Sequence, residues 1–276
     1  MTPLQQKELQ LLALFVRICE ALELRYYLVC GTALGAVKYR GFIPWDDDVD
    51  VAMPREDYET FLREAPALLP EGIFLQNYRT DPAFPQIFSK LRDSGTTYLE
   101  KSSAHLPIHH GMYIDIFPLD GYPAQKHRQL WLEVRKKLYL QLLGTAFAEP
   151  EPLKSRIIFR IKRFFGLQRY SAVFARGYEN MIRSFPAADS SLWCNHGNWQ
   201  GRREYAPRAQ YGRGTGAVFE GLPVRIPEQY DAYLRQKYGD YRQDPPKAEQ
   251  VGHHYHTVCD PDRPYTFYTD PKGDEI

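Results

Sequence analysis

Apolar residues recur at helical spacing near the start of the chain. Leu11, Phe15 and Ile18 fall on one face of a 3.6-residue period, and other leucines extend the same face. Thr2 followed by Pro3 is typical of a helix start, because threonine caps the first turn and proline suits the first helical position. The pattern predicts an N-terminal helix that packs on a sheet.

The next apolar stretch is short and extended in character. Residues 26–30 are rich in strand formers and stop at Gly31, and residues 32–39 then have helical character as far as Gly41. A strand that enters a helix through a Gly-Thr pair leaves backbone N–H groups and the hydroxyl of Thr32 at the helix N-terminus. The helix dipole favours an anion there, so this turn suits a phosphate group.

Polar and apolar residues alternate strictly from Asp48 to Val51. In an extended strand, successive side chains point to opposite faces, so Asp48 and Asp50 share one face while Val49 and Val51 share the other. The two aspartates then lie about 6 to 7 Å apart, close enough to converge on one hard cation. The preceding Asp46 and Asp47 are equally compatible with a solvated acidic turn.

Further strands and one helix follow in the first half of the chain. A helix is predicted from Pro54, strands over residues 73–77 and 87–92 in the same sheet, and another strand over residues 112–117 that carries Asp115. Residues 101–110 read as a loop that can lie over the site. Asp120 precedes a glycine, which predicts a turn.

The pattern becomes helical after Pro123. Helices are predicted over residues 125–147, over 155–185 with a break near Gly166, and over 219–239. After Pro261 the sequence is rich in Pro, Asp and Gly, which predicts loose order.

One of these helical segments, residues 154–169, mixes basic residues with isoleucines and phenylalanines. Such a segment can lie on an anionic membrane, where lipid-linked acceptors would be found. It can equally be a bundle helix whose apolar stripe faces the sheet while its charges face water. The sequence leaves both interpretations open.

Composition sets outer limits on function. Apolar residues make up 43% of the 276 residues and charged residues 25%, as in soluble globular proteins. The formal net charge of +1 argues against a general nucleic-acid binder. No apolar run approaches the roughly 20 residues that span a bilayer, and the N-terminal apolar run lacks the features of a signal peptide.

The cysteines suggest a reducing compartment. Cys19, Cys30, Cys194 and Cys259 are far apart in the sequence and lie mostly in apolar settings. They therefore read as free thiols, and the cytoplasm is the expected location.

The motifs around the aspartates carry a family resemblance. An apolar strand, Gly-Thr, a short helix and Asp-Val-Asp-Val in this order resemble the signature of the nucleotidyltransferase-fold superfamily. Six longer strings resemble, more narrowly, the LicD family of phosphocholine transferases. They are Gly-Thr-Ala-Leu-Gly at 31–35, Gly-Phe-Ile-Pro-Trp-Asp-Asp-Asp-Val-Asp at 41–50, Lys-Leu-Arg at 90–92, Ile-Asp-Ile-Phe-Pro-Leu-Asp at 114–120, Phe-Glu-Gly at 219–221 and Pro-Pro at 245–246. The resemblance covers most of the chain and is weakest between about residues 125 and 211.

This resemblance implies an α/β fold (α+β) with a nucleotidyltransferase-like mixed β-sheet core, flanking helices and a largely helical C-terminal elaboration. We expect the catalytic core, with the N-terminal helix, in residues 1–123, and the elaboration packed on it in residues 124–276.

The resemblance also implies a reaction. Family members are thought to move phosphocholine, or a related phospho-alditol group, from a cytidine diphosphate (CDP) carrier such as CDP-choline to a hydroxyl of a surface glycan. Asp48 and Asp50 would hold Mg²⁺ (or Mn²⁺) against the diphosphate, with Asp115 as a third metal ligand or as the base that takes the acceptor proton. Asp46 is the alternative base, and Gly31 with Thr32 would steady phosphate oxygens.

Basic and aromatic residues extend the expected site. Lys90 and Arg92 share a strand face and can meet the diphosphate as a point charge and a fork, although exposed basic residues are also common on edge strands. A quaternary ammonium is held by aromatic faces and carboxylates, and Trp45 beside the aspartates is the aromatic candidate.

The histidines give little support for a zinc site. His109-His110 and His253-His254 with His256 lack a paired Cys-x-x-Cys and a helical i, i+4 spacing. One of the latter group can approach the substrate instead, because the family pattern tends to carry histidine there.

Two other functions stay open. A nucleotidyltransferase that moves a nucleotide from a nucleoside triphosphate to a small molecule or protein would use the same Gly-Thr turn and carboxylate strand. A binding or regulatory module that has lost its catalytic activity is the third interpretation. The presence of Asp48, Asp50 and Asp115 argues against it. The expected partners are a CDP-linked donor and a glycan acceptor, lipid-linked or not. A peripheral contact at the inner face of the membrane is compatible with this reaction.

Overall fold

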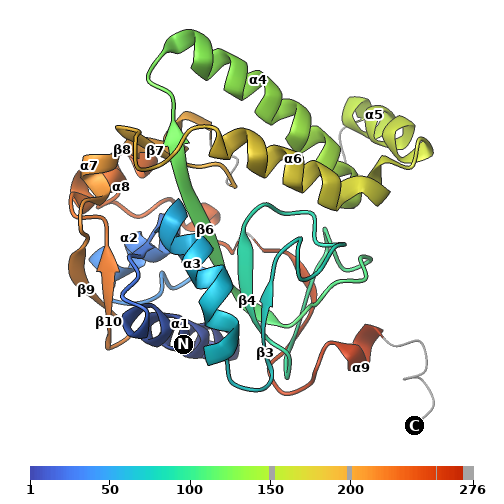
Figure 1. Ribbon diagram of the computed structural model, residues 1–276. Coiled ribbons are helices and arrows are strands. Elements are labelled where there is room, and N and C mark those ends of the chain that lie inside the picture. The colour runs from blue at the N-terminus through green and yellow to red at the C-terminus, as the bar shows by residue number, and fades with distance from the viewer. Residues whose placement is uncertain (149–152, 198–200, 253, 270–276) are drawn as a thin grey trace.

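The computed structural model describes residues 1–148, 153–197, 201–252 and 254–269. It is a mixed α/β structure, as predicted (Figure 1). The helices are α1 (Pro3–Ala21), α2 (Cys30–Lys38), α3 (Arg55–Glu64), α4 (Lys126–Leu143), α5 (Leu153–Phe164), α6 (Ser171–Arg183), α7 (Arg208–Tyr211), α8 (Tyr230–Tyr238) and α9 (Thr266–Thr269), with short 3₁₀ helices η1 (Ala65–Leu68), η2 (Gly144–Ala146), η3 (Leu167–Tyr170), η4 (Gly201–Glu204) and η5 (Lys247–Glu249). The strands are β1 (Tyr27–Leu28), β2 (Asp50–Pro54), β3 (Ile73–Gln76), β4 (Ser89–Asp93), β5 (Thr97–Glu100), β6 (Met112–Tyr122), β7 (Leu192–Asn195), β8 (Tyr205–Pro207), β9 (Thr215–Phe219), β10 (Leu222–Ile226) and β11 (His256–Asp260).

The main sheet is built around the long strand β6. Its strand order is β1-β2-β6-β4-β3, and β7, which pairs with β8, continues the sheet beside the second half of β6. Strands β2 and β6 are parallel and the other pairs are antiparallel. Strands β9 and β10 form a hairpin, and β11 pairs with β5. The prediction that residues 73–77 and 87–92 belong to one sheet is confirmed by β3 and β4.

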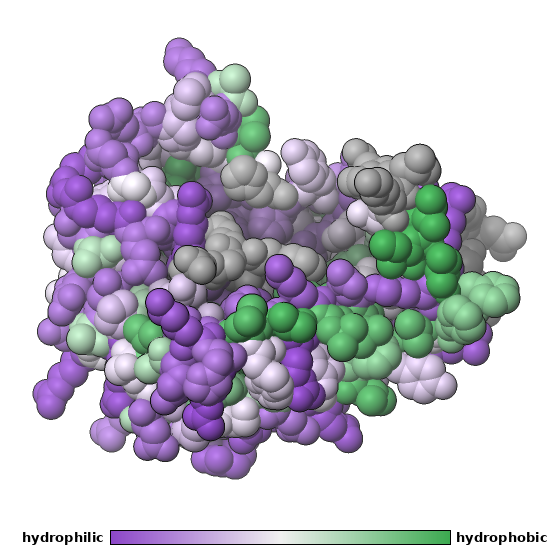
Figure 2. Space-filling view, turned by 90° about the horizontal axis from the view of Figure 1, so that it is seen from above, coloured by the Kyte–Doolittle hydropathy of each residue, from purple (hydrophilic) through white to green (hydrophobic). Residues whose placement is uncertain are grey.

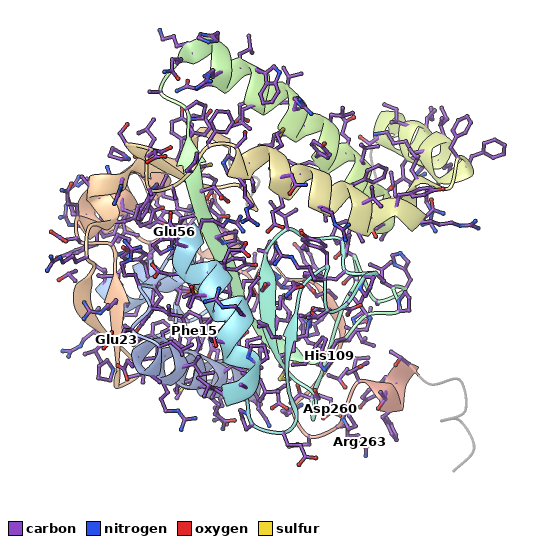
Figure 3. All side chains as sticks on the ribbon, in the orientation of Figure 1. Phe15, Glu23, Glu56, His109, Asp260 and Arg263 are labelled. Carbon is purple, nitrogen blue, oxygen red and sulfur yellow. The ribbon has the colours of Figure 1, made fainter. Side chains whose placement is uncertain are left out.

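One face of the sheet is apolar and is covered by α1 and α3 (Figure 1). Phe15 of α1, which is labelled in Figure 3, contacts Phe61 of α3 with ring centroids 5.2 Å apart. Val51, Ile114 and the neighbouring apolar strand residues are fully buried in the same cluster. This burial leaves the opposite face of the sheet free to carry polar side chains.

The N-terminal helix begins as predicted. The hydroxyl of Thr2 accepts a hydrogen bond from the backbone N–H of Gln5, and the side-chain oxygen of Gln5 accepts one from the backbone N–H of Thr2. This reciprocal capping box satisfies two donors that the first turn cannot pair internally. Proline at the first helical position completes the start.

Two local predictions in the core are wrong. Strand β2 begins only at Asp50, so Asp48 precedes the strand and does not lie in it. Asp120 does not form a turn: it lies within β6 and is 1% exposed. Its carboxylate accepts two hydrogen bonds from Arg55, from Nε at 2.8 Å and from Nη2 at 2.6 Å. This buried ion pair keeps the chain extended through the Asp-Gly pair.

The helices after Pro123 are arranged as the sequence predicts. Helix α4 packs along α6, and α5 lies at the far end of this pair (Figure 1). The predicted break is at Gly166, whose φ of +70° lies in the left-handed region that favours glycine. The proposed boundary at residue 123/124 stays a prediction, and across it β7 pairs with β6.

Only part of the helix predicted within residues 219–239 forms. Helix α8 covers Tyr230–Tyr238, whereas Phe219 ends β9 and the chain returns in β10 through Glu220 and Gly221. Both turn residues have positive φ, +47° and +80°, as a two-residue hairpin turn requires. The helix interpretation of the first part of this segment is therefore wrong.

Within the described residues, Cys19, Cys194 and Cys259 are free thiols, of which Cys259 is exposed and the other two are buried. None of the helices in the described ranges is both long and apolar enough to cross a bilayer.

Candidate functional site

A row of polar residues crosses the face of the sheet that α1 and α3 leave uncovered. In the strand register, Gln76 of β3 lies opposite Lys90 of β4, Lys90 opposite Asp115 of β6, and Asp115 opposite Asp50 of β2. Residues directly opposite on paired strands point to the same face. Four neighbouring strands therefore place two carboxylates and an ammonium side by side at the centre of the sheet.

The predicted alternation around β2 is present, although the strand is shorter than predicted. Val49 and Val51 are fully buried in the apolar cluster, while the carboxylates of Asp48 and Asp50 lie on the other side. The hydroxyl of Thr32, predicted to bind phosphate, accepts a hydrogen bond of 2.8 Å from the backbone N–H of Asp50. Thr32 thus fixes the point at which β2 begins.

A C-terminal segment crosses the acidic loop that precedes β2. The backbone N–H of His254 donates to Oδ2 of Asp47 at 3.1 Å, and its imidazole Nε2 lies 3.1 Å from Oδ2 of Asp48. Gly252 permits this crossing, because a Cβ at that position would lie 2.4 Å from Oδ2 of Asp47. This crossing places the imidazole ring of His254 beside Asp48, one of the carboxylates predicted to bind the metal.

The carboxylates around His254 control its protonation. Burial alone would lower the pKa of His254, but its hydrogen bonds to Asp48 and Glu100 outweigh burial and raise the pKa to about 11. Conversely, although burial favours the neutral acid, His254 holds the pKa of Asp48 below its ordinary value. The stability that His254 contributes is complete below about pH 6.5, its unfolded pKa, and is lost as the pH rises towards 11.

The site is crowded with carboxyl groups. Burial and the charges of Asp48 and Asp115 raise the pKa of Asp50 well above its ordinary value, and burial with the charges of Asp48 and Asp47 raises that of Asp46 to about 8. Glu8 of α1 also has a raised pKa, from burial and from the charge of Asp48 first among its neighbours. Like charges held this close repel one another unless a cation compensates them.

The donor set fits a divalent cation. Asp47, Asp48 and His254 each offer one ligand atom, and these atoms lie within 4.8 Å of one another. Carboxylate oxygens suit Mg²⁺ and Mn²⁺, and His254 could join them only after its ring loses the proton directed at Asp48, because a protonated imidazole has no lone pair for a metal. Within the described residues, Oε2 of buried Glu8 has no hydrogen-bond partner, which adds to the uncompensated acidity. The predicted set of Asp48, Asp50 and Asp115 shares this region, with Asp115 as the neighbour of Asp50 across the β2–β6 pair.

Lys90 is the cation nearest to the strand carboxylates. Its Nζ lies 2.8 Å from Oδ1 of Asp115 and 3.2 Å from the ring centroid of Tyr113. Burial raises the pKa of Asp115 in spite of this neighbour. Lys90 therefore stands where an anionic group near Asp50 and Asp115 would meet a positive charge.

Arg92 is bound inside the protein. It is 1% exposed, its Nε donates to Oε1 of Gln76 at 2.5 Å, and its Nη1 donates to the backbone oxygen of Gly111 at 2.6 Å. These bonds occupy donors that the sequence analysis expected to form a fork with a diphosphate. The guanidinium also lies over the ring of Tyr113, 4.7 Å from its centroid, and so packs beside Lys90 on the same face of the sheet.

Gly31 and Trp45 both adjoin Asp46 at the start of the acidic loop. A Cβ at Gly31 would lie 2.6 Å from Oδ2 of Asp46, so the absence of a side chain lets this carboxylate approach helix α2. Trp45 is half-buried and packs edge-on against Tyr39, with ring centroids 6.3 Å apart. Both residues thus adjoin the acidic loop at the positions predicted for substrate contacts.

A small cavity of about 90 Å³ adjoins this cluster. Lys90, Asp115, Glu100 and His254 supply its polar wall, and phenylalanines supply the apolar one. Residues of the 101–110 loop, predicted to lie over the site, also line it.

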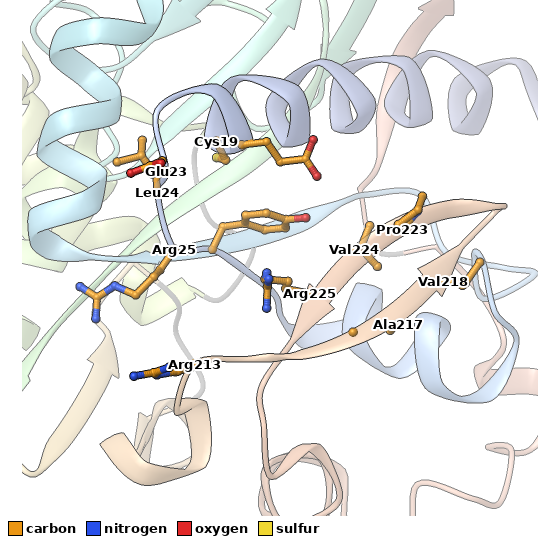
Figure 4. Close-up of a pocket in the computed structure, with 13 residues that line it drawn as sticks. Cys19, Glu23, Leu24, Arg25, Arg213, Ala217, Val218, Pro223, Val224 and Arg225 are labelled. Carbon is orange, nitrogen blue, oxygen red and sulfur yellow. The ribbon is translucent and has the colours of Figure 1, made fainter.

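A larger cavity of about 850 Å³ lies elsewhere, between the end of α1 and the β9–β10 hairpin (Figure 4). Cys19 and Glu20 line it, whereas Glu8 near the start of the same helix faces the carboxylates. Twelve helical residues correspond to about 18 Å, so this cavity is separate from the cluster.

Some residues at the site belong to no recognisable sequence motif. Glu100 accepts a hydrogen bond of 3.0 Å from the hydroxyl of Tyr113, and its carboxylate lies within 3.5 Å of Nδ1 of His254. Glu8 is on a helix that the sequence presents only as an apolar stripe. His254 was foreseen as one of several histidines that can approach the site, and its neighbour His253 lies outside the described residues.

We expect Gly252→Ala to disturb the site without unfolding the protein. The new methyl group would displace the carboxylate of Asp47, which also holds the backbone of His254. Overpacking of this kind costs about 1 to 3 kcal/mol. NMR of the histidine side chains should show the His254 ring protonated from pH 6 to 9 in the native protein and titrating within that range in the variant.

Gly216→Ala is the matched control, because nothing lies within 4 Å of its Cβ position. An unchanged His254 titration in Gly252→Ala would show that Asp47 does not position this histidine.

Comparison with known proteins agrees with this geometry. Residues 23–142 match the profile of the family described as LicD/FKTN/FKRP, nucleotidyltransferase domain. This range contains β1, α2, β2, β4 and β6, and so includes Asp48, Asp50, Lys90 and Asp115. The family resemblance deduced from the sequence is confirmed.

Individual relatives extend the match. The chain is 28% identical to the lipopolysaccharide cholinephosphotransferase LicD of Haemophilus influenzae over 274 aligned residues. The alignment covers 89% of this chain and 92% of that protein. Two uncharacterized proteins, of Rickettsia prowazekii and Rickettsia typhi, are 47% identical over 34 residues, or 12% of this chain and 13% and 11% of theirs. The last two matches are local.

Proposed function

We propose that the protein transfers phosphocholine, or a related phospho-alditol group, from a CDP-linked donor to a hydroxyl of a cell-surface glycan precursor, because residues 23–142 match the profile of the LicD/FKTN/FKRP nucleotidyltransferase domain. Lipopolysaccharide, teichoic acid and capsule precursors all offer such hydroxyls. The relative from Haemophilus influenzae, named a lipopolysaccharide cholinephosphotransferase, supports phosphocholine as the group and a glycan as the acceptor.

The row Asp50–Asp115–Lys90 carries the proposal. Two carboxylates and an ammonium on adjacent strands, with Asp48 beside them, can hold a diphosphate and the cation that accompanies it. A site for neutral substrates would gain nothing from this concentration of charge.

In the proposed reaction, the acceptor hydroxyl attacks the phosphorus that bears choline. The bond from this phosphorus to the oxygen bridging it to cytidine monophosphate (CMP) breaks, CMP leaves with that electron pair, and a phosphodiester to the glycan forms. Asp115 or Asp46 takes the hydroxyl proton, and Lys90 contacts the phosphate oxygens. Mg²⁺ or Mn²⁺, held by Asp48 and Asp50 with help from Asp115 or Asp47, would supply charge neutralisation at the diphosphate.

The chemistry of this site addresses the part of the donor that CDP-choline, CDP-ribitol and CDP-glycerol have in common. A nucleotidyltransferase acting on a nucleoside triphosphate would use the same carboxylates. Ligand selectivity therefore distinguishes the two reactions.

Thermal unfolding of the full chain tests the proposal. We expect CDP-choline with Mg²⁺ to raise the unfolding midpoint by roughly 5 °C or more, because a ligand at 100 times its dissociation constant stabilises the native state by about 2.7 kcal/mol. CDP-ribitol, CDP-glycerol, CTP and ATP, each with and without Mg²⁺, are measured alongside.

A metal-dependent shift selective for one CDP-linked compound would support the transferase and name its donor. A shift with CTP or ATP alone would replace the proposal by nucleotidyl transfer, and no shift with any compound would contradict the site assignment.

We further propose a cytoplasmic location, at the inner face of the cell membrane when the acceptor is lipid-linked. The buried free thiols of Cys19 and Cys194 support a reducing compartment.

A further inference from the structure

Exposed apolar side chains concentrate on one part of the molecule. Along α5 and the turn after it, Ile157, Ile158, Ile161, Phe164 and Phe165 are all more than half exposed, and Phe164 reaches 86%. Their spacing places them on one helix face, which the bundle interpretation of this segment would have buried against the sheet. That interpretation is wrong for these residues, although Phe159 on another side of α5 is buried.

Helix α4 presents a second exposed stripe. Leu130, Val134 and Leu138 follow one another at intervals of four residues, and each is more than half exposed. Figure 2, which views the molecule from the side of α4 and α5, shows a band of hydrophobic side chains flanked by hydrophilic ones. An apolar patch of this kind on a folded protein marks a surface that contacts something else.

The charge around this patch is strongly positive. Residues 124–183 contain 13 Lys and Arg and 4 Asp and Glu, a net charge of +9, whereas the whole chain carries +1. Of the four acids, Glu179 is buried between Arg55 and Arg79. A second copy of this chain would bring +9 against +9, so like-charge repulsion opposes self-association through this face.

We propose that this face, formed by α4, α5 and the start of α6, docks on an anionic lipid surface. Exposed Ile, Leu and Phe would enter the boundary between headgroups and acyl chains, and the surrounding Lys and Arg would meet lipid phosphates. The proposal rests on exposure and charge alone and does not depend on the reaction proposed above.

The docking face also connects to the carboxylate site. Helix α4 ends in η2, and Phe147 directly after it lines the small cavity beside Lys90, Asp115 and His254. The backbone N–H of Ala148 donates to the oxygen of Ser102 at 2.8 Å, which ties this end to the loop over the site. A membrane bound by α4 and α5 would thus lie at the end of a segment that lines this cavity.

Vesicle flotation of the full chain tests this surface. We expect binding to vesicles of phosphatidylcholine mixed with phosphatidylglycerol and little binding to phosphatidylcholine alone, with binding weakened by salt. Phe164→Asp should lower the partition coefficient at least about tenfold, because a buried Phe contributes about 1.5 to 3 kcal/mol. Arg160→Gln, at an exposed position that flanks this apolar face, should lower it about fivefold, since each basic residue near an anionic surface contributes about 1 kcal/mol.

Phe267→Asp on α9 is the matched control, because Phe267 is also about half exposed but lies outside the face. It should bind like the native protein, and equal unfolding midpoints would show that all variants fold. Absence of binding, equal binding to neutral vesicles, or equal loss in Phe267→Asp would overturn the proposal. Concentration-dependent dimers in sedimentation, abolished by Phe164→Asp, would replace the lipid by a second copy.

Discussion

Asp50→Asn is expected to lower the rate of CMP release from CDP-choline by roughly 10³-fold or more. Asparagine keeps the size and position of the side chain but removes the charge that would hold a cation at the diphosphate. Loss of such charge stabilisation raises a barrier by several kcal/mol, and each 1.36 kcal/mol corresponds to a factor of ten. The initial rate with Mg²⁺ present, followed by chromatography of CMP, gives the measurement.

The same substitution should not destabilise the metal-free protein. Asp50 is 8% exposed beside Asp48 and Asp115, so removing its charge relieves repulsion, and the unfolding midpoint without Mg²⁺ should be equal or higher. Asp262→Asn, at an exposed position outside the site, should leave both quantities unchanged. A rate within threefold of the native value for Asp50→Asn would place the reaction away from β2.

Asp120→Ala is expected to destabilise the fold by about 3 to 5 kcal/mol. The substitution leaves the buried guanidinium of Arg55 without its bidentate partner, and an uncompensated buried charge is costly. Glu179 of α6 still contacts Arg55 at 3.0 Å, which limits the loss. Urea unfolding followed by circular dichroism measures the change in the free energy of unfolding.

Asp231→Ala provides the comparison. Asp231 forms ion pairs with Arg235 on α8 and with Arg242, and it accepts a hydrogen bond of 2.7 Å from the hydroxyl of Tyr241. The side chains of Asp231 and both arginines are nearly half exposed or more, so water and salt screen the pairs. We expect only a small loss of stability, much smaller than that caused by Asp120→Ala. Equal effects of the two substitutions would mean that the Arg55–Asp120 pair contributes no more than a surface contact.

Local patterns predicted much of the core correctly. The apolar stripe and the Thr-Pro start of α1, the Gly-Thr entry into α2 and the alternation at Asp48–Val51 depend on residues near one another in the chain. The pairing of Asp50 with Asp115 follows once β2 and β6 are neighbours. These features were legible because one element decides each of them.

Long-range partners decided what the sequence did not reveal. An Asp-Gly pair favours a turn, but Arg55, 65 residues earlier, holds Asp120 in a strand. Likewise, the side-chain oxygen of Gln76 and the backbone oxygen of Gly111 accept hydrogen bonds from the guanidinium of Arg92. The spacing of tyrosines suggested one long helix, but the Glu220-Gly221 turn forms a β-hairpin in the first part of this segment. Both turn residues have positive φ, as a two-residue hairpin turn requires.

The sequence also predicted amphipathic helices, but it did not predict what lies against their apolar faces. The period of residues 154–169 predicted a helix with one apolar face, and either a sheet or a membrane could lie against it. Only the exposure of Phe164 and its neighbours distinguishes the two.

The histidine that compensates Asp48 arrives 206 residues after it. During synthesis on the ribosome, the strands that carry Asp50 and Asp115 emerge long before residues 250–254, since N-terminal parts of a chain fold first. The nascent core must therefore carry its crowded carboxylates without the imidazole of His254 until residues 250–254 have been synthesised. A shortened chain that stops before this segment can form the sheet but not the finished site, so the order of synthesis delays the onset of its chemistry until that segment has been made.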